Sequence, residues 1–149
     1  MLYSTLTHPN ILRALAAAGH GSQILIADGN YPLATQTPST AERVYLNLAP
    51  GLVSVTDILK ALVSAVPLEA AIVMHPDTGI EPTIFAEFHS LLPHIVLEET
   101  ERFNFYRLAS KGDVTLAIAS GEQRLYANIL LTIGVVTPSP TESAIPANR

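Results

Sequence analysis

The sequence predicts an α/β fold with three layers, in which helices cover both faces of a mostly parallel, mixed central sheet. Short apolar runs of β type alternate along the chain with stretches whose apolar residues recur at helical spacing. Of the 149 residues, 48% are hydrophobic and only 14% are charged, which is typical of a globular protein with a substantial core. We expect one domain over residues 1–137 and a flexible Pro/Ser/Thr-rich tail over residues 138–149.

The first part of the chain is predicted to form a helix, a strand, a turn and a second strand. The helix is expected to begin near Pro9, because proline is favoured at the first helical position. Gly19 is well placed to end it in a left-handed conformation. The apolar run at residues 23–27 then predicts a strand, the Gly- and Pro-containing segment 28–32 predicts a turn, and residues 43–48 predict a second strand.

The rest of the chain continues the alternation. Ser54 and Asp57 have the spacing of an N-cap pair close to a capping box, and they predict a helix that ends by Pro67. Beyond it, we expect further helices and strands: strands at 70–74, 94–97, 114–119 and 128–136, a helix opened by Pro82 and a helix over 100–111.

Composition excludes several classes of function. A net charge of −5 with only 8 Lys and Arg residues argues against a nucleic-acid partner. The absence of cysteine excludes disulfides and thiolate chemistry. No uncharged apolar run reaches the roughly 18 residues of a membrane span, and the N-terminus lacks the pattern of a signal peptide, so we expect a cytoplasmic protein. The low charge suggests that apolar surface is buried between subunits of an oligomer.

Polar residues follow the predicted strands where a site is expected. In open α/β sheets, ligands bind at the carboxyl ends of the strands. Residues at or just after these ends include Asp28, His75, Glu99 with Arg102, and the segment 120–122. His20 precedes the strand that ends at Asp28, and we expect it to approach the same site from the end of the first helix.

No cofactor or metal motif stands out. The glycines around His20 do not form a dinucleotide fingerprint, because a helix precedes them, a strand follows and the third glycine is absent. His89 and His94 are poorly spaced for a metal site, so we predict no metal. Taken singly, the polar residues have structural explanations too: His20 as a helix-end residue, Asp28 as a turn cap, Arg102 as part of a solvated helix face.

Three blocks of the sequence, taken together, indicate a function more specifically than these single residues do. GHGSQILIADGNYP, RFNFY and SGEQRLYANILLTIGVV resemble the sugar mutarotase family of ribose pyranases and fucose mutarotases, over nearly the whole chain to about Thr137. The resemblance implies a small α/β subunit of the ribose pyranase type that assembles into a ring-like homo-oligomer, typically a decamer. It also implies an isomerase that interconverts the anomers and ring forms of a free monosaccharide without a cofactor.

The resemblance assigns roles to five residues. His20 matches the catalytic histidine of the family, and Asp28 matches its substrate-binding aspartate. Arg102, which precedes Phe-Asn-Phe-Tyr, matches the substrate-binding arginine of the fucose branch. Tyr126 and Asn128 match the Tyr-x-Asn pair that contacts the sugar.

Two positions depart from the fucose branch. Ser22-Gln23 stands where that branch usually has an acidic pair, and Ala127 makes the last motif more similar to the ribose branch. We favour L-fucose as the substrate because of Arg102 and the aromatic residues after it. The alternatives are a D-ribose pyranase, a non-catalytic module that binds a monosaccharide, and a purely structural subunit of an oligomer.

Overall fold

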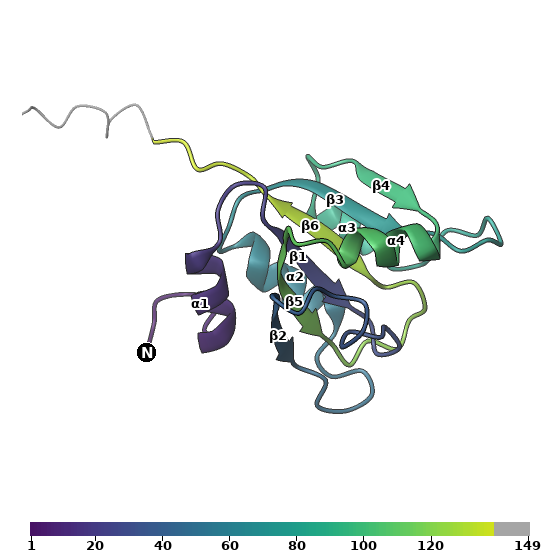
Figure 1. Ribbon diagram of the computed structural model, residues 1–149, viewed down its shortest axis with the longest axis horizontal. Helices are drawn as coiled ribbons and strands as arrows, with labels where there is room; N and C mark the ends of the chain where they lie inside the picture. Colours follow the sequence, from purple (N-terminus) through teal and green to yellow (C-terminus); the bar gives the residue numbers. More distant parts are fainter. Residues whose placement is uncertain (139–149) are drawn as a thin grey trace, which may run out of the picture.

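The computed structural model describes residues 1–138, in which helices and strands alternate along the chain (Figure 1). The helices are α1 (Pro9–Ala17), α2 (Val55–Val63), α3 (Phe85–Leu91) and α4 (Arg102–Ala109). The strands are β1 (Gln23–Ala27), β2 (Glu42–Tyr45), β3 (Leu68–Met74), β4 (Leu97–Thr100), β5 (Val114–Ala119) and β6 (Ile129–Ile133).

The strands form one mixed sheet of six, in the order β2-β5-β1-β6-β3-β4. β6 runs antiparallel to both of its neighbours, β1 and β3. The other pairs, β1 with β5, β2 with β5 and β3 with β4, are parallel. Five strands therefore point the same way, and the predicted mostly parallel, mixed sheet is confirmed.

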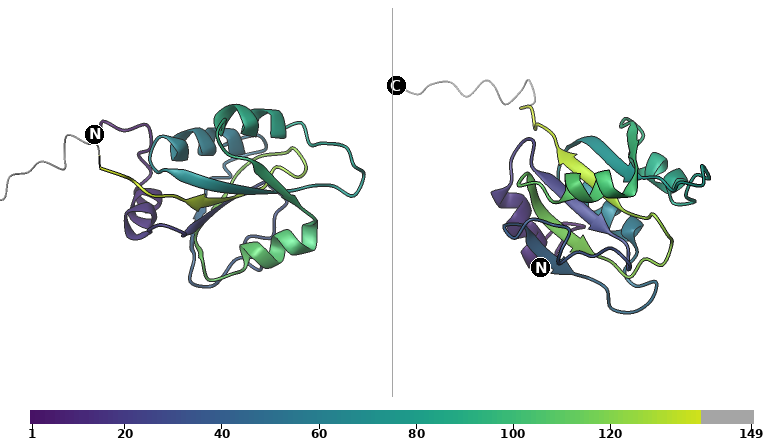
Figure 2. Two further views of the ribbon diagram at one scale, coloured as in Figure 1. Left: turned by 90° about the horizontal axis from the view of Figure 1, so that it is seen from above. Right: turned by 45° about the vertical axis from the view of Figure 1, so that its right-hand side comes forward.

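Helices cover both faces of the sheet, as the left view of Figure 2 shows for α2 and α3 on one side and α4 on the other. Alternate residues of β1 divide between two cores, since successive side chains of a strand point to opposite faces. Ile24 and Ile26 pack with residues of α1, α2 and α3. Leu25 and Ala27 pack with Phe105 of α4 and with the loop after β1. The predicted three layers are thus present.

Local signals place the start of α2 correctly. The Ser54 hydroxyl accepts a hydrogen bond from the Asp57 backbone N–H, and the Asp57 side chain accepts one from the Ser54 N–H. This reciprocal pair satisfies two backbone donors that a helix start otherwise leaves without partners.

The prediction of a strand over residues 94–97 was wrong. The strand at this point is β4, which begins at Leu97 and pairs with Ala71–Met74 of β3. Val96, which belongs to the predicted strand, is 82% exposed. β4 is an edge strand with exposed glutamates, and its register is determined by pairing with β3 rather than by a local apolar pattern.

The prediction of a left-handed Gly19 was also wrong. α1 ends at Ala17, and the chain leaves it through Ala18 in an extended conformation, so no left-handed residue is needed there. The left-handed glycine is Gly21, with φ 82°, in the turn just before β1. Its N–H donates to the carbonyl of Ile133, which ties this turn to the end of β6.

The expectations of a C-terminal tail and of no membrane span can be compared with the structure only within residues 1–138. Of the tail predicted over residues 138–149, only Pro138 lies within the described residues. Within residues 1–138, every helix falls short of the length and apolarity needed to cross a membrane.

Candidate functional site

A cavity of about 470 Å³ opens where β1 ends and β6 begins. Because β6 is antiparallel to β1, the residue after β1 and the residue before β6 lie side by side. Four predicted residues line this cavity: Asp28, Arg102, Tyr126 and Asn128. The rest of the lining is Asn30 and an aromatic and apolar wall of Tyr31, Met74, Tyr106 and Leu125.

Asp28 and Asn128 form the buried floor of the site. The Asp28 backbone N–H donates to Asn128 Oδ1 over 2.8 Å, and Asn128 Nδ2 donates to Asp28 Oδ2 over 3.0 Å. The other carboxylate oxygen of Asp28 accepts the Asn30 backbone N–H over 3.0 Å. Asp28 is 6% exposed and Asn128 is 3% exposed, so the pair is rigidly held within the protein.

Burial changes the titration of Asp28. Removal of the carboxylate from water raises the pKa of Asp28, and the hydrogen bonds from Asn30 and Asn128 partly offset this by favouring the charged form. An aspartate in this environment can accept hydrogen bonds from a ligand and is better suited than an exposed aspartate to hold a proton.

Arg102 and Tyr126 form one side of the cavity. Arg102, the first residue of α4, donates from Nη2 to the Tyr126 hydroxyl over 3.1 Å, and its guanidinium carbon lies 5.8 Å from the centre of the tyrosine ring. This hydrogen bond is the main reason that the pKa of Arg102 is held above its ordinary value. Arg102 is exposed, so most of its donors remain free for a ligand.

Tyr126 has an unusual backbone conformation, with φ 60°. Residues other than glycine are uncommon in this left-handed region, and asparagine, aspartate and histidine are the usual exceptions. The conformation directs the tyrosine toward Arg102, while Asn128, two residues on, faces Asp28.

Sequence reasoning missed two aromatic residues of the cavity. Tyr31 packs edge-on against Tyr106, with 5.3 Å between ring centres, and its hydroxyl donates to the Gln36 carbonyl over 3.0 Å. Burial raises the pKa of Tyr31, so its hydroxyl stays protonated. Tyr31 lies three residues after Asp28, and Tyr106 lies one helical turn after Arg102, so proximity to the predicted residues was the available signal.

His20 lies away from this cavity. It occupies the turn before β1, whereas Asp28 follows the end of β1. A five-residue strand spans about 16 Å, which is longer than a histidine side chain can bridge. The expectation that His20 approaches Asp28 within one chain was therefore wrong, because the strand between them is extended.

The partner of His20 is Glu69, which sequence reasoning also missed. His20 Nε2 lies 3.0 Å from Glu69 Oε1 and 3.1 Å from Oε2, and both side chains are substantially exposed. Glu69 stands where the pairing of β3 with β6 changes register, between Leu68 and Ala70. The two residues are 49 positions apart, and no local pattern connects them.

The other residues expected at the carboxyl edge line neighbouring cavities, and Ser120 shares one of about 350 Å³ with Asp28. His75 and Glu99 contribute to one of about 410 Å³ beyond β3 and β4. Ser120 and Glu122 contribute to another of about 380 Å³, which shares only Asn30 with the Asp28 cavity. Within residues 1–138, no group of three or more His, Cys, Asp or Glu side chains is arranged to hold a metal ion.

The geometry of the Asp28 cavity suits a small polyol. It offers a carboxylate, a guanidinium, an amide and phenol groups, which supply both donors and acceptors at several points around a volume that holds a monosaccharide. The apolar and aromatic walls supply surfaces for the C–H faces of a sugar ring.

The comparisons with known proteins agree with this geometry. The chain is 31% identical to the fucose mutarotase of Homo sapiens, over 91% of this chain and 93% of that protein. It is 31% identical to the D-ribose pyranase of Paracidovorax citrulli, over 91% and 98% of the two chains. The structure of Bacillus subtilis RbsD complexed with D-ribose superposes with a TM-score of 0.80 at 25% identity, covering 92% of this chain and all of that one.

The family model described as the RbsD / FucU transport protein family matches residues 1–136, which include all six strands and all five predicted site residues. The chain belongs to the RbsD / FucU family.

Proposed function

We propose that this chain is a monosaccharide mutarotase, an isomerase that opens and recloses the cyclic hemiacetal of a free sugar. The observation that carries the proposal is the Asp28 cavity in a chain related to fucose mutarotases and ribose pyranases. Ring opening breaks the bond between the anomeric carbon and the ring oxygen. The ring oxygen gains a proton, and the anomeric hydroxyl loses one. Reclosure on the other face of the carbonyl gives the other anomer.

The cavity residues bind and orient the sugar in this proposal. Asp28 accepts hydrogen bonds from sugar hydroxyls, and Asn128 holds the Asp28 carboxylate in place. Arg102 donates to sugar oxygens from the cavity mouth, and Tyr126 contributes its hydroxyl. The reaction is neither a redox step nor a carbanion step, so these side chains and one proton carrier suffice without a cofactor.

His20 is the proton carrier in this proposal. Histidine has an unperturbed pKa of about 6.5, which lets it give and take a proton near neutral pH. A carboxylate beside Nε2 favours the tautomer in which Nε2 carries the proton and leaves Nδ1 to accept one, so Glu69 orients His20 for this role. General acid–base help of this kind contributes roughly 10²–10⁴-fold to a rate.

Since His20 and Asp28 lie at opposite ends of β1, we propose that His20 of one copy completes the cavity of a neighbouring copy. A homo-oligomer, as the family resemblance implies, brings the two ends together. Exposed apolar residues near the cavity, Phe103 at 74% and Leu125 at 66% exposure, are suited to burial in such an interface. A decamer is the proposed assembly.

Mixing two inactive variants tests this arrangement. His20→Ala and Asp28→Ala are each expected to lose most of the anomer exchange measured by saturation-transfer NMR. If the two residues of a site come from different chains, random co-assembly of equal amounts restores about one quarter of the sites. Two residues of the same chain would restore none. An oligomer that forms without recovered exchange would refute the shared site.

L-Fucose is the proposed substrate. Arg102 is followed by the aromatic residues typical of the fucose branch, and Met74 and Leu125 give the cavity apolar atoms that fit a methyl group. The buried Ala127 favours ribose, so D-ribose is the second candidate. Exchange rates for L-fucose, D-ribose and L-rhamnose under the same conditions decide between them. Faster exchange of ribose, with fucose exchange unchanged in Arg102→Ala, would refute the choice of fucose.

His20→Ala also separates the enzyme from a binding module. We expect the variant to lose exchange while it still binds fucose, because His20 carries protons and the cavity residues provide the binding contacts. Exchange at the wild-type rate would refute the role of His20.

A cytoplasmic location stays a prediction, which fractionation of cells that produce a tagged chain would test.

A further inference from the structure

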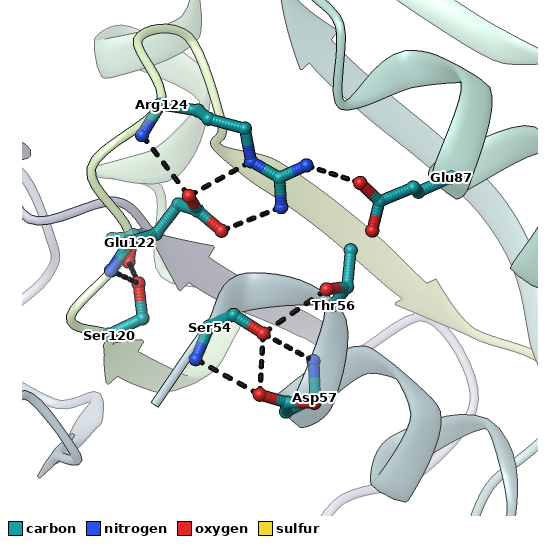
Figure 3. Close-up of polar contacts among 8 residues, drawn as sticks. Ser54, Thr56, Asp57, Glu87, Ser120, Glu122 and Arg124 are labelled. Atoms are coloured by element: carbon teal, nitrogen blue, oxygen red, sulfur yellow. Dashed lines mark hydrogen bonds and ion pairs between the residues drawn. The ribbon is translucent and has the colours of Figure 1, made fainter. Parts of the chain in front are cut away.

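The connection between β5 and β6, residues 120–128, carries three side chains of the Asp28 cavity yet contains neither helix nor strand. Those side chains are Leu125, Tyr126 and Asn128. Besides backbone hydrogen bonds to Ala27, Gly29, Gly51 and Val53, this connection is held by the side chain of Arg124, a residue outside the cavity lining (Figure 3).

Arg124 binds Glu122 through one edge of its guanidinium with two hydrogen bonds. Nε donates to Oε1 of Glu122 over 3.0 Å, and Nη2 donates to Oε2 over 2.9 Å. The backbone N–H of Arg124 donates to the same Oε1 over 3.1 Å. The remaining arm, Nη1, donates to Glu87 of α3, so the connection is fastened to a helix on one face of the sheet (Figure 3).

Glu122 is the buried centre of this network, which we name the Arg124 clamp (Glu87, Glu122 and Arg124). Its side chain is only 7% exposed. The hydrogen bond from Arg124 is the main cause that lowers the pKa of Glu122, so the carboxylate stays charged. Loss of Arg124 would leave a buried charge without its partner, which is far more unfavourable than loss of an exposed ion pair.

The clamp is connected to the cavity on two sides. The Glu122 carbonyl accepts the backbone N–H of Gly29 over 2.9 Å, next to Asp28. A Cβ at Gly29 would lie 3.0 Å from that carbonyl oxygen, so a larger residue would displace the carbonyl by a few tenths of an ångström. On the other side, Tyr126 follows Arg124 by two residues and has its backbone at φ 60°. A residue in this sparsely populated region keeps its conformation only when its surroundings hold it.

We propose that Arg124 is a positioning residue for sugar binding: by fixing the 120–126 backbone between Glu122 and Glu87, it holds Tyr126 against Arg102 in the cavity. The inference rests on the proposed function, since it takes Tyr126 and Arg102 as sugar contacts. Arg124 acts only through Tyr126 and Asn128, because it does not line the cavity itself.

The expected effect is on binding. Without the clamp, the Tyr126 hydroxyl loses its fixed place 3.1 Å from Arg102 Nη2. A displacement of about 1 Å in a site of this kind costs up to about 10²-fold. We expect Arg124→Met to raise the KM for fucose about tenfold and to lower kcat less, since His20 is untouched. Arg124→Lys keeps the charge but cannot form the paired hydrogen bonds to Glu122, so it is expected to recover part of the loss.

The experiment compares these variants with Arg13→Met. Arg13 also forms an ion pair between two elements, with Glu42 of β2 at 2.6 Å, but on a part of the molecule remote from the cavity. Exchange kinetics with L-fucose give KM and kcat, and the NMR signals of the Tyr126 and Asn128 amides in the sugar-free protein report the position of the connection. Both are expected to change in Arg124→Met and to remain unchanged in Arg13→Met.

Each outcome decides the proposal. Arg124→Met with wild-type KM and unshifted Tyr126 signals would overturn it, even if the melting temperature fell, because the clamp would then be merely structural. If Arg124→Met does not fold, Glu87→Gln removes only the α3 arm and is expected to give a smaller rise in KM with the same signal shifts; unchanged values would overturn the proposal. A wild-type protein without exchange would refute the proposed function instead, and the sugar-free NMR signals would still test the clamp.

Discussion

Asn128→Asp places a second carboxylate against Asp28, and the structure gives the size of the effect. Asn128 Nδ2 lies 3.0 Å from Asp28 Oδ2, and both residues are almost fully buried. The substitution replaces an N–H donor by an oxygen at this distance. Two buried carboxylates so close cannot both be charged, so the folded protein keeps one proton between them as an O–H···O hydrogen bond.

The cost of keeping that proton depends on pH. An unfolded aspartate has a pKa of about 3.9, and each pH unit above it costs about 1.4 kcal/mol for a carboxyl that must stay protonated. The folded pKa of the pair is raised above the unfolded value. Below about pH 4 the Asn128→Asp variant therefore keeps its full free energy of unfolding. That free energy falls as the pH rises toward the folded pKa of the pair. Between pH 4.5 and pH 7 the variant is expected to lose about 3 kcal/mol relative to the wild type.

Urea unfolding at fixed protein concentration, repeated at several pH values, measures this loss, and the fixed concentration keeps the concentration dependence of any assembly the same in every sample. The matched control is the double variant Asp28→Asn, Asn128→Asp, which exchanges the amide and the carboxylate and leaves one charge. Its stability relative to the wild type should depend much less on pH. A loss in Asn128→Asp that is the same at pH 4.5 and pH 7 would refute the buried contact between positions 28 and 128.

Three further substitutions test the fold around the site. Ser54→Ala removes the capping box shared with Asp57 and is expected to lower the free energy of unfolding by about 1 kcal/mol, whereas Ser54→Asp should retain most of it. Phe88→Ala empties a fully buried position of α3 and is expected to cost about 3–5 kcal/mol in chemical denaturation; a loss below about 1 kcal/mol would contradict its burial. Tyr31→Phe removes the hydroxyl that donates to the Gln36 carbonyl and is expected to cost about 1 kcal/mol in thermal unfolding, while an unchanged melting temperature would show that the bond contributes nothing.

The sequence predicted the fold best where the determining interactions are local. The strand at residues 23–27 and the start of α2 depend on an apolar run and on two residues three positions apart, and both predictions are confirmed. β4 depends on pairing with β3, more than 20 residues earlier, and its exposed glutamates carry no signal of burial. The prediction failed there because the position of an edge strand depends on its pairing with the neighbouring strand, which the local sequence does not show.

The same distinction applies to the candidate site. Asp28 was predicted from its position at the end of a strand, and the structure places it in one cavity with the three other proposed sugar contacts. Glu69 and Glu87 were missed because each finds its partner 37 or more positions away in the sequence. The separation of His20 from Asp28 follows from the length of the strand between them, which the sequence already contained.

The place of β6 in the sheet has a consequence for how the protein is made. β6 lies between β1 and β3, and among residues 1–138 it is the one strand that joins the β2-β5-β1 half of the sheet to the β3-β4 half. On the ribosome, both halves emerge before residues 129–133 do, and each exposes an unpaired inner edge until those residues arrive. The contact between Asp28 and Asn128 spans 100 positions and forms only at that stage. Until then the nascent chain has two edges open to wrong pairing, and the Asp28 cavity is among the last parts to assemble.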